Sequence, residues 1–369
     1  MLEFDLIQKY FSRPIKNNPQ SIKLNIGDDC AVLDLQQFKN GENLAISVDT
    51  FSENTHFLST DNAFDIAWKA LAVNLSDLAA CAAEPCWFSL AIALPENLAK
   101  NSQWLQNFSD GLFACADKFN IVLIGGDTTK SEKLSITINV LGKTKNDYFL
   151  TRKAAQIKDD IWISGQVGLA NLGLKLKLKN NDANNIETLL SPLWQKLCLK
   201  KLHQPTPRLD LAKLLAEQKI ATSCIDISDG LWSDLSHIAE QSKVLAELNL
   251  HLLPIQPLPL VVEKNILKAL DKNQQNLLRR SMLQSLLGGG DDYELCFTAK
   301  ADEITRLKIA EIAAKLDLPL HRIGEIKALP ENTNANNAKF VRLVDAENNE
   351  IDAKKEVDLQ FFTHFSTHF

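Results

Sequence analysis

The chain has 369 residues, which is long enough for two ordinary domains and a large hydrophobic core. Hydrophobic residues make up 45% and charged residues 23% of the chain, as in soluble globular proteins. The net charge is −6, and no basic block is present that could follow the phosphate backbone of a nucleic acid, which excludes proteins that bind nucleic acid in this way. A polyphosphate ligand would therefore need divalent cations to neutralise it.

The cysteines and the N-terminus indicate a cytoplasmic protein that does not enter membranes. None of the seven cysteines forms a C-x-x-C pair and most lie in apolar runs, so we expect buried reduced thiols rather than disulfides or a zinc site. Residues 1–12 have the pattern of a short amphipathic helix and not of a signal peptide. No later apolar run is long enough to span a membrane.

In the first half of the chain, acids recur at strand ends, turns and one helix face. A Gly-Asp-Asp turn at 27–29 lies between two apolar segments, and a solvated hairpin turn would explain it about equally well. A strand over 43–50 is predicted to deliver Asp49 at its end. In the helix predicted over 63–83, Asp77 lies on a different face from the apolar stripe, so a cation or a salt bridge must balance it.

The stretch 121–129 is the clearest example of this pattern. After a helix over about 104–119, the apolar residues 121–124 predict a buried strand, and Gly125 and Gly126 allow a sharp turn before Asp127. A carboxylate at such a strand end can hold a cation beside a phosphate. Taken alone, the stretch is also explained by an ordinary strand-to-loop turn.

The second half repeats the pattern after a domain boundary that we place within 143–159. The strand and glycine turn at 161–169 lacks the lysine of a P-loop, which favours a purely structural turn. A later strand places Asp226 and Ser228 on one face, and Asp229 is predicted to cap the next helix. Capping explains Asp229 but not Asp226.

Three glycines and two acids precede a strand at 287–297, and a helix is predicted over 303–316. Nine aspartates in all occupy strand ends, turns or the one helix face: Asp28, Asp29, Asp49, Asp77, Asp127, Asp226, Asp229, Asp291 and Asp292. Such an excess of carboxylates, without matching cysteines and histidines, indicates hard cations such as Mg²⁺. Clustered Mg²⁺ indicates a phosphate-rich substrate and phosphoryl transfer.

Six motifs resemble, in order, those of the thiamine-monophosphate kinase family. They are GDDCA at 27–31, SVDT at 47–50, KALAVNLSDLA at 69–79, GGDTT at 125–129, IDISDG at 225–230 and GGDDYEL at 289–295. The resemblance covers nearly the whole chain. It implies an α/β (α+β) PurM-like fold, with an N-terminal ferredoxin-like domain over 1–148 and a C-terminal α/β domain over 149–369.

The resemblance also implies an activity and an assembly. Members of the family transfer the γ-phosphoryl group of ATP directly onto thiamine monophosphate, which gives thiamine diphosphate. ATP would be the co-substrate, several Mg²⁺ ions would assist, and no covalent or acid–base catalytic residue is expected. The N-terminal domain would bind ATP and Mg²⁺ and would pair its sheet with that of a second copy in a homodimer.

Matched motifs assign the site residues in three groups. The implied Mg²⁺ ligands are Asp29, Ser47, Val48 (through its backbone carbonyl), Asp49, Asp77, Asp127, Asp226 and Asp229. The implied ATP contacts are Gly126, Arg152 and Ser228. The implied thiamine-phosphate contacts are His56, Asp291 and Phe362.

Two residues depart from the family pattern. Asp291 stands where relatives often have glutamate, and Phe362 where Tyr or Trp is common, which keeps stacking but loses a polar tip. Extra length is expected in 176–200 and 328–340. The alternatives are another PurM-like ATP-dependent enzyme, of the selenophosphate or aminoimidazole-ribonucleotide synthetase type, or a nucleotide-binding module without catalysis.

Overall fold

The computed structural model describes the residue ranges 22–24, 31–34, 41–145, 148–178, 186–330 and 339–353. The chain divides into two compact units. Unit 1 comprises Met1–Leu150, Thr206–Glu217 and Thr363–Phe369, and unit 2 comprises Thr151–Pro205 and Gln218–Phe362. The segment Thr206–Glu217 therefore belongs to unit 1, although it follows the first part of unit 2 in sequence.

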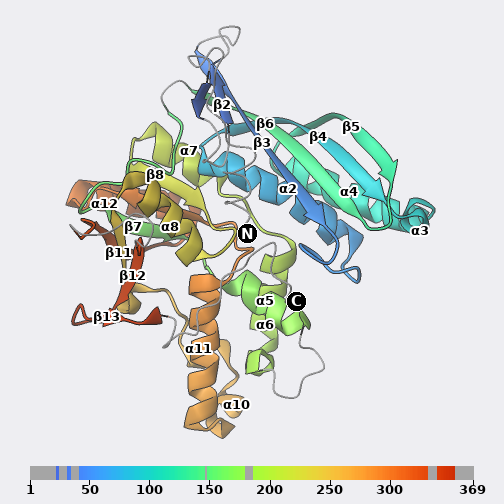
Figure 1. The fold of residues 1–369 in the computed structure, drawn as a ribbon. Helices are drawn as coiled ribbons and strands as arrows, with labels where there is room; N and C mark the ends of the chain where they lie inside the picture. The colour runs from blue at the N-terminus through green and yellow to red at the C-terminus, as the bar shows by residue number, and fades with distance from the viewer. Residues whose placement is uncertain are drawn as a thin grey trace. The chain divides into compact units, whose positions relative to one another are not determined.

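Unit 1 is built on a six-stranded mixed sheet (Figure 1). In spatial order its strands are β1 (Ile22–Leu24), β2 (Ala31–Asp34), β3 (Glu42–Ser52), β6 (Ser135–Lys145), β4 (Glu84–Leu94) and β5 (Val122–Lys130). Neighbouring strands are antiparallel except β4 and β5, which are parallel. Buried and half-buried residues alternate along β6, so one face of the sheet is covered.

Helix α2 covers that face, where it contacts β3, β4 and β6. The helices of unit 1 are α2 (Ala63–Ala80), α3 (Glu96–Ala99), α4 (Ser102–Lys118) and α7 (Leu209–Glu217). Asn62 starts α2 by accepting the Phe64 N–H at 2.9 Å. Helices α2 and α4 pack closely, because a Cβ added at Gly111 would lie only 2.1 Å from the Phe64 carbonyl oxygen. α7 packs against α2 as well.

Unit 2 is built on a seven-stranded sheet. In spatial order its strands are β13 (Glu350–Ile351), β12 (Val341–Val344), β9 (Leu245–Asn249), β11 (Leu320–Lys327), β7 (Asp160–Ser164), β10 (Leu295–Ala299) and β8 (Ala221–Asp226). Only β12 and β9 pair in parallel. Every residue of β7 and β10 is buried, which fits their central place and their nearly unbroken apolar sequence.

Several helices complete unit 2. They are α5 (Leu169–Leu178), η2 (Ile186–Leu189), α6 (Pro192–His203), α8 (Leu231–Ser242), η3 (Leu250–Leu252), α9 (Leu258–Val261), α10 (Lys264–Ala269), α11 (Lys272–Gly288) and α12 (Glu303–Leu316). The main core lies where Leu231, Leu235 and Ile238 of α8 pack against the sheet, and all three are fully buried. A second core joins α5, α6 and α11.

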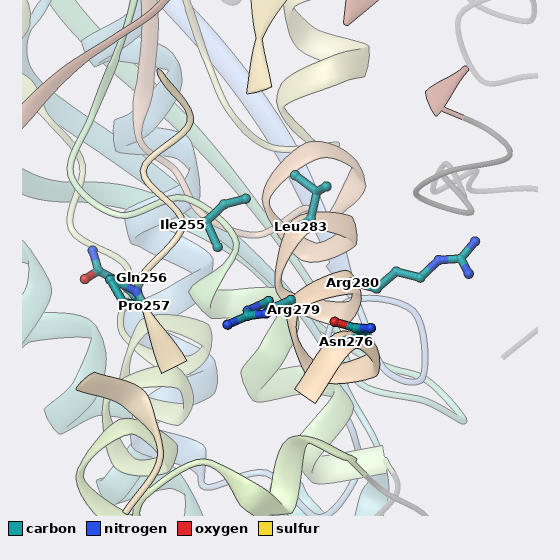
Figure 2. Close-up of a pocket in the computed structure, with 7 residues that line it drawn as sticks. All are labelled: Ile255, Gln256, Pro257, Asn276, Arg279, Arg280 and Leu283. Atoms are coloured by element: carbon teal, nitrogen blue, oxygen red, sulfur yellow. The ribbon is translucent and has the colours of Figure 1, made fainter. Parts of the chain in front are cut away.

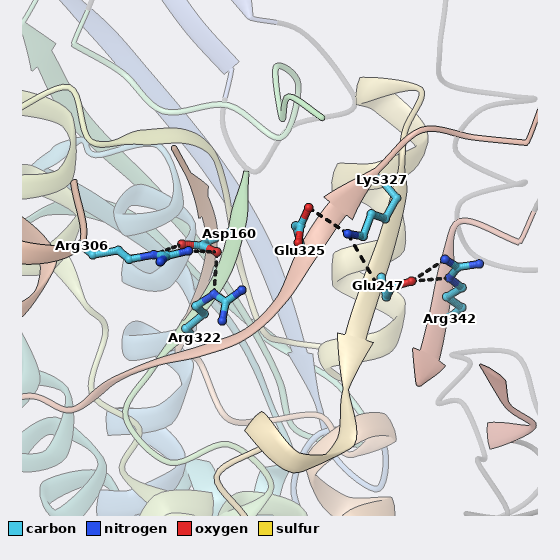
Figure 3. A network of polar contacts seen from close by, with 7 residues as sticks. All are labelled: Asp160, Glu247, Arg306, Arg322, Glu325, Lys327 and Arg342. Atoms are coloured by element: carbon cyan, nitrogen blue, oxygen red, sulfur yellow. Dashed lines mark hydrogen bonds and ion pairs between the residues drawn. The ribbon is translucent and has the colours of Figure 1, made fainter. Parts of the chain in front are cut away.

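A buried carboxylate with two arginines anchors the first residue of β7 (Figure 3). Asp160 is fully buried and accepts two hydrogen bonds from Arg306, at 2.6 and 3.0 Å, and one from Arg322 at 2.5 Å. Nearby in the same view, Glu247 pairs with Arg342 and Lys327. None of these ion pairs includes a predicted site residue, so we assign them to the stability of the unit 2 sheet.

The predicted mixed α/β architecture is confirmed, and so are most predicted elements. The helices predicted over 63–83 and 303–316 correspond to α2 and α12, the latter with the same ends. The helix at 1–12 lies outside the described residues. Among the residues that the structure describes, no helix is both long and apolar enough to cross a bilayer.

Candidate active site

Ser47, Asp49 and Asp77 lie together in unit 1, where β3 contacts α2. The Ser47 hydroxyl donates a hydrogen bond to Asp77 Oδ2 at 2.6 Å, and the Asp49 N–H donates to Asn74 Oδ1 at 3.1 Å. Ser47 and Asp49 both face the helix because residues two apart on a strand point to the same side. Asn74, which is buried and donates to the Ala70 carbonyl at 2.9 Å, was missed by sequence reasoning. Its place one turn before Asp77 on the same helix face was the available signal.

Asp127 lies on the other face of this sheet. In the strand register it pairs with Ala91, and the same row continues through Thr137 to Thr50. Thr50 and Thr137 share a hydrogen bond at 2.8 Å on that outer face, where Val48 is also exposed. Within unit 1, Asp127 therefore does not join the acids that face α2.

The prediction for the stretch around Gly126 was wrong in two respects. The strand is not buried in the single chain, since Val122 and Ile124 are more than half exposed, and it does not end at the glycines but continues to Lys130. Glycine is still required, because a Cβ at Gly126 would lie 1.8 Å from the carbonyl oxygen of Leu90 on the neighbouring strand. Its role is close strand packing rather than a turn. Similarly, Asp49 lies inside β3 and not at its end.

His56 is held at the end of β3. Its Nδ1 accepts a hydrogen bond from the Ser52 N–H at 3.0 Å, and its ring stacks on Phe51 with centroids 5.1 Å apart. Because Nδ1 accepts, a neutral His56 carries its proton on Nε2. The ring is thus oriented before any ligand binds.

In unit 2, β8 ends at the buried Asp226, and a tight turn follows through Ser228, Asp229 and Gly230. The prediction that Asp229 caps α8 was wrong: Gly230 is the N-cap residue, with φ +116°, and no side chain caps from that position. Instead Asp234, inside the helix, accepts the three backbone N–H groups of the turn at 3.0, 3.1 and 3.1 Å. Asp229 therefore does not act as the cap of α8.

The segment that carries Asp291 pairs with this turn. The Asp291 N–H donates to the Ser228 carbonyl at 2.9 Å, and the Tyr293 N–H donates to the Ile227 carbonyl at 2.8 Å. Asp291 and Tyr293 both have left-handed backbone, with φ of 71° and 51°. Such conformations cost free energy in residues other than glycine and persist where surrounding contacts enforce them.

Asp292 anchors the same segment from the other side. Its buried carboxylate accepts the N–H groups of Gly168 at 2.6 Å and Ala170 at 3.2 Å, at the start of α5. Burial raises the pKa of Asp292 to about 8, against the two N–H donors, which lower it. Nearby, Glu294 pairs with Lys201 at 2.8 Å. Sequence reasoning counted Asp292 among the acids but gave it no role of its own.

The acids of unit 2 form one electrostatic group. Burial raises the pKa of Asp234, repulsion from Asp229 and Asp226 raises it further, and the positive charge of Arg152 lowers it. The predicted ATP contact Arg152 therefore lies close enough to this group to act on it. Ser242 fixes the segment by donating to the Arg152 carbonyl at 3.4 Å.

The structure therefore brings together only part of the predicted site: Ser47, Asp49 and Asp77 in unit 1, and the residues around the turn after β8 in unit 2, whereas Val48 and Asp127 lie on the other face of the unit 1 sheet. Asp29 and Phe362 lie outside the described residues. In the part of the chain that the structure describes, no three His, Cys, Asp or Glu side chains already form a metal-binding cluster. The hydroxyl and carboxylate oxygens nevertheless make a hard donor set of the kind that Mg²⁺ prefers.

One concavity, of about 410 Å³, lies elsewhere in unit 2 (Figure 2). It is lined by residues of α11 and of the segment before α9: Ile255, Gln256, Pro257, Asn276, Arg279, Arg280 and Leu283. Figure 2 shows the Arg280 side chain extending away from the residues of the facing segment. No predicted site residue lines this concavity.

Comparison with known proteins identifies the family. Residues 27–144 match the family described as AIR synthase related protein, N-terminal domain. Thiamine-monophosphate kinase of Haemophilus influenzae is 40% identical over 327 residues, which cover 88% of this chain and 89% of that protein. The chain belongs to the thiamine-monophosphate kinase family. The predicted membership and PurM-like two-domain fold are confirmed.

Solved thiamine-monophosphate kinases share the whole fold. The enzyme from Stenotrophomonas maltophilia K279a is 39% identical, with a TM-score of 0.68 over 92% of this chain and 96% of that one. A complex of AaThiL with AMPPCP and TMP is 25% identical, with a TM-score of 0.72 over 99% of this chain and 97% of that one. Both units therefore have counterparts in thiamine-monophosphate kinases.

Proposed function

We propose that this protein transfers the γ-phosphoryl group of ATP to thiamine monophosphate, which gives thiamine diphosphate, with Mg²⁺ as the required cation. The observation that carries the proposal is the 40% identity to a thiamine-monophosphate kinase across nearly the whole of both chains. Further support comes from AaThiL, a similar protein that has been solved with AMPPCP and TMP. The family defines the donor and the acceptor, and the residues of this chain suggest how the two are held.

The donor set in each unit suits Mg²⁺. In unit 1, Ser47, Asp49 and Asp77 offer hydroxyl and carboxylate oxygens from two rigid elements, β3 and α2. In unit 2, Asp226 and Asp229 both lie close enough to the buried Asp234 to raise its pKa, so this group of acids would gain from a bound cation. When bound, Mg²⁺ would neutralise the charge that builds up on the transferring phosphoryl group.

The remaining residues hold the two substrates in line. Arg152 would attract the phosphates of ATP, and His56, already fixed by Ser52 and Phe51, would present its Nε2–H to the acceptor phosphate. Asp291 would hold the thiamine part of the acceptor. Because both reactants are anionic, positioning and charge neutralisation supply the rate enhancement, and no covalent intermediate is needed.

A homodimer joined through the outer face of the unit 1 sheet is part of the proposal. Three apolar side chains, Val48, Trp87 and Val122, are 56%, 40% and 57% exposed in the single chain. Cross-strand pairing places all three on the face turned away from α2. Asp127 lies on this same face, so in the dimer it would serve the site of the partner copy.

Product analysis tests the activity. Chromatography after incubation with Mg²⁺, ATP and thiamine monophosphate should show thiamine diphosphate and an equal amount of ADP. Asp49→Ala and Asp127→Ala should each abolish turnover without unfolding the chain, whereas Asp117→Ala, at an exposed position on α4, should be active. Wild-type turnover in either of the first two variants would refute the metal assignment. ADP release without thiamine diphosphate would favour a different acceptor.

Mixing the two inactive variants tests whether Asp127 acts across the dimer. A mixed dimer has one site with Asp49 of its own and Asp127 of the partner intact, so mixing should restore activity. If Asp127 acts within its own chain, every site in the mixture lacks one carboxylate. No recovery after verified subunit exchange would then rule out the shared site.

A further inference from the structure

We infer that Asp234 is a positioning residue, whose buried carboxyl group fixes the Ser228–Gly230 turn and so the places of Asp226 and Asp229 beside it. The inference rests on the proposed function for the use of those acids. Its structural basis is independent of that function, because it comes from hydrogen bonds within unit 2.

The contacts of Asp234 are unusual for a residue inside a helix. A single oxygen, Oδ2, accepts three successive backbone N–H groups, from Ser228, Asp229 and Gly230, at 3.0, 3.1 and 3.1 Å. The residue is only 3% exposed, so water cannot replace these bonds easily. Three converging N–H groups before a helix form a cradle that often binds an external anion such as phosphate.

Here the chain supplies the acceptor oxygen itself. With Asp234 in the cradle, the N–H groups before α8 cannot bind a phosphate of the nucleotide. The turn instead keeps one shape, in which the Asp291 N–H bonds to the Ser228 carbonyl at 2.9 Å. The cradle thereby becomes a rigid support for an acidic surface made by Asp226 and Asp229.

The turn that Asp234 fixes joins the two acids. Asp226 is the last residue of β8, and Asp229 is the middle one of the three residues whose N–H groups Asp234 accepts. A turn held in one shape therefore keeps both acids in fixed places, without contact between Asp234 and a cation. Loss of such a supporting residue typically weakens metal affinity or activity by about 10- to 100-fold.

Two variants test the role of the acceptor oxygen. Asp234→Asn keeps an oxygen that can accept the three N–H groups, and Asp234→Ala removes it. The matched control is Asp302→Ala, which deletes the N-cap of α12 in the same unit, where Asp302 accepts the Thr305 N–H at 2.8 Å.

Hydrogen exchange measured by mass spectrometry on the peptide that contains 228–230 reports shape without any substrate. We expect exchange there to be at least about 10-fold faster in Asp234→Ala and near wild type in Asp234→Asn and in the control. The Mg²⁺ concentration for half-maximal turnover should rise about 10-fold or more in Asp234→Ala, with recovery at high Mg²⁺, and not in Asp234→Asn or the control.

Unchanged exchange in Asp234→Ala would overturn the positioning role, and an unchanged Mg²⁺ requirement in that variant would overturn the link to the acids. If Asp234→Ala does not fold, Asp234→Glu, which moves the acceptor oxygen by one methylene, takes its place in both measurements, with the same two outcomes deciding. If the wild-type protein does not phosphorylate thiamine monophosphate, the proposed function fails, and the exchange measurement still tests the role of Asp234 in the turn.

Discussion

The Asp160 ion pairs allow a stability prediction whose size follows from the structure. Asp160 begins β7, an interior strand of the unit 2 sheet, and is fully buried, and its carboxylate accepts three hydrogen bonds from Arg306 and Arg322 (Figure 3). Removing one partner of a fully buried ion pair typically costs about 3–5 kcal/mol. The two arginine side chains are 44% and 35% exposed and can turn toward water once the carboxylate is gone. We therefore expect Asp160→Ala to cost about 2–3 kcal/mol.

The assay is urea unfolding followed by circular dichroism, with the melting temperature as a second measure. For a domain of this size class, 2–3 kcal/mol corresponds to about 4–12 °C. Arg306→Ala should cost clearly less, because Arg322 still neutralises the buried carboxylate. A loss below about 0.5 kcal/mol in Asp160→Ala, the range of ordinary surface substitutions, would refute the reasoning. So would a larger loss in Arg306→Ala than in Asp160→Ala.

Three further predictions concern other parts of the chain. Gly126→Ala should lower turnover at least about 10-fold in the ATP-dependent assay, because the new Cβ would meet the Leu90 carbonyl and shift the strand that carries the next acid; wild-type turnover would contradict this. Burial raises the pKa of Asp292 from 3.8 to about 8 in the folded chain. Between these two pH values the folded chain therefore binds one proton that the unfolded chain has lost. The free energy of unfolding should therefore fall as pH rises through this window, by at most about 1.4 kcal/mol per pH unit, and urea titrations of Asp292→Asn should lack that slope; an equal slope in the variant would contradict the assignment. Among the described cysteines, iodoacetamide should modify Cys86 first, because the other five are buried and burial raises the pKa of Cys198 to about 12. The check is mass spectrometry of the labelled native protein, and modification of Cys198 before Cys86 would contradict the prediction.

Periodicity predicted the elements whose packing is local and regular. The helix α2 follows from apolar residues at three- and four-residue steps, and α12 begins after Asp302, which accepts the Thr305 N–H in the way an N-cap residue should. The strand β5 shows where periodicity fails. Its apolar start resembles a buried strand, but Val122 is exposed in the single chain, and apolar runs cannot distinguish a core strand from one that another surface covers.

The acids show a similar limit at the level of the site. The sequence indicates that Ser47 and Asp77 both belong to a cation site, but their 2.6 Å contact joins residues 30 positions apart and depends on how β3 lies against α2. The sheet face of Asp127 depends on register across three strand pairs, which one sequence does not define. The prediction of a single cluster of acids therefore included residues that the fold separates within one chain.

The turn after β8 explains why local rules chose the wrong capping residue. An aspartate directly before a helix usually accepts N–H groups from the first turn, which favoured Asp229. In the structure Gly230 is the N-cap residue, and the N–H groups that find a side-chain acceptor are those of Ser228, Asp229 and Gly230, which precede the helix. Gly230, at φ +116°, bends the backbone so that these groups converge on Asp234. The capping rule looks for an acceptor before the helix, whereas here the acceptor lies inside it, after its donors in sequence. Because Asp234 is buried, these bonds supply the polar contacts that water cannot, and a rule based on neighbouring residues in the sequence does not find them.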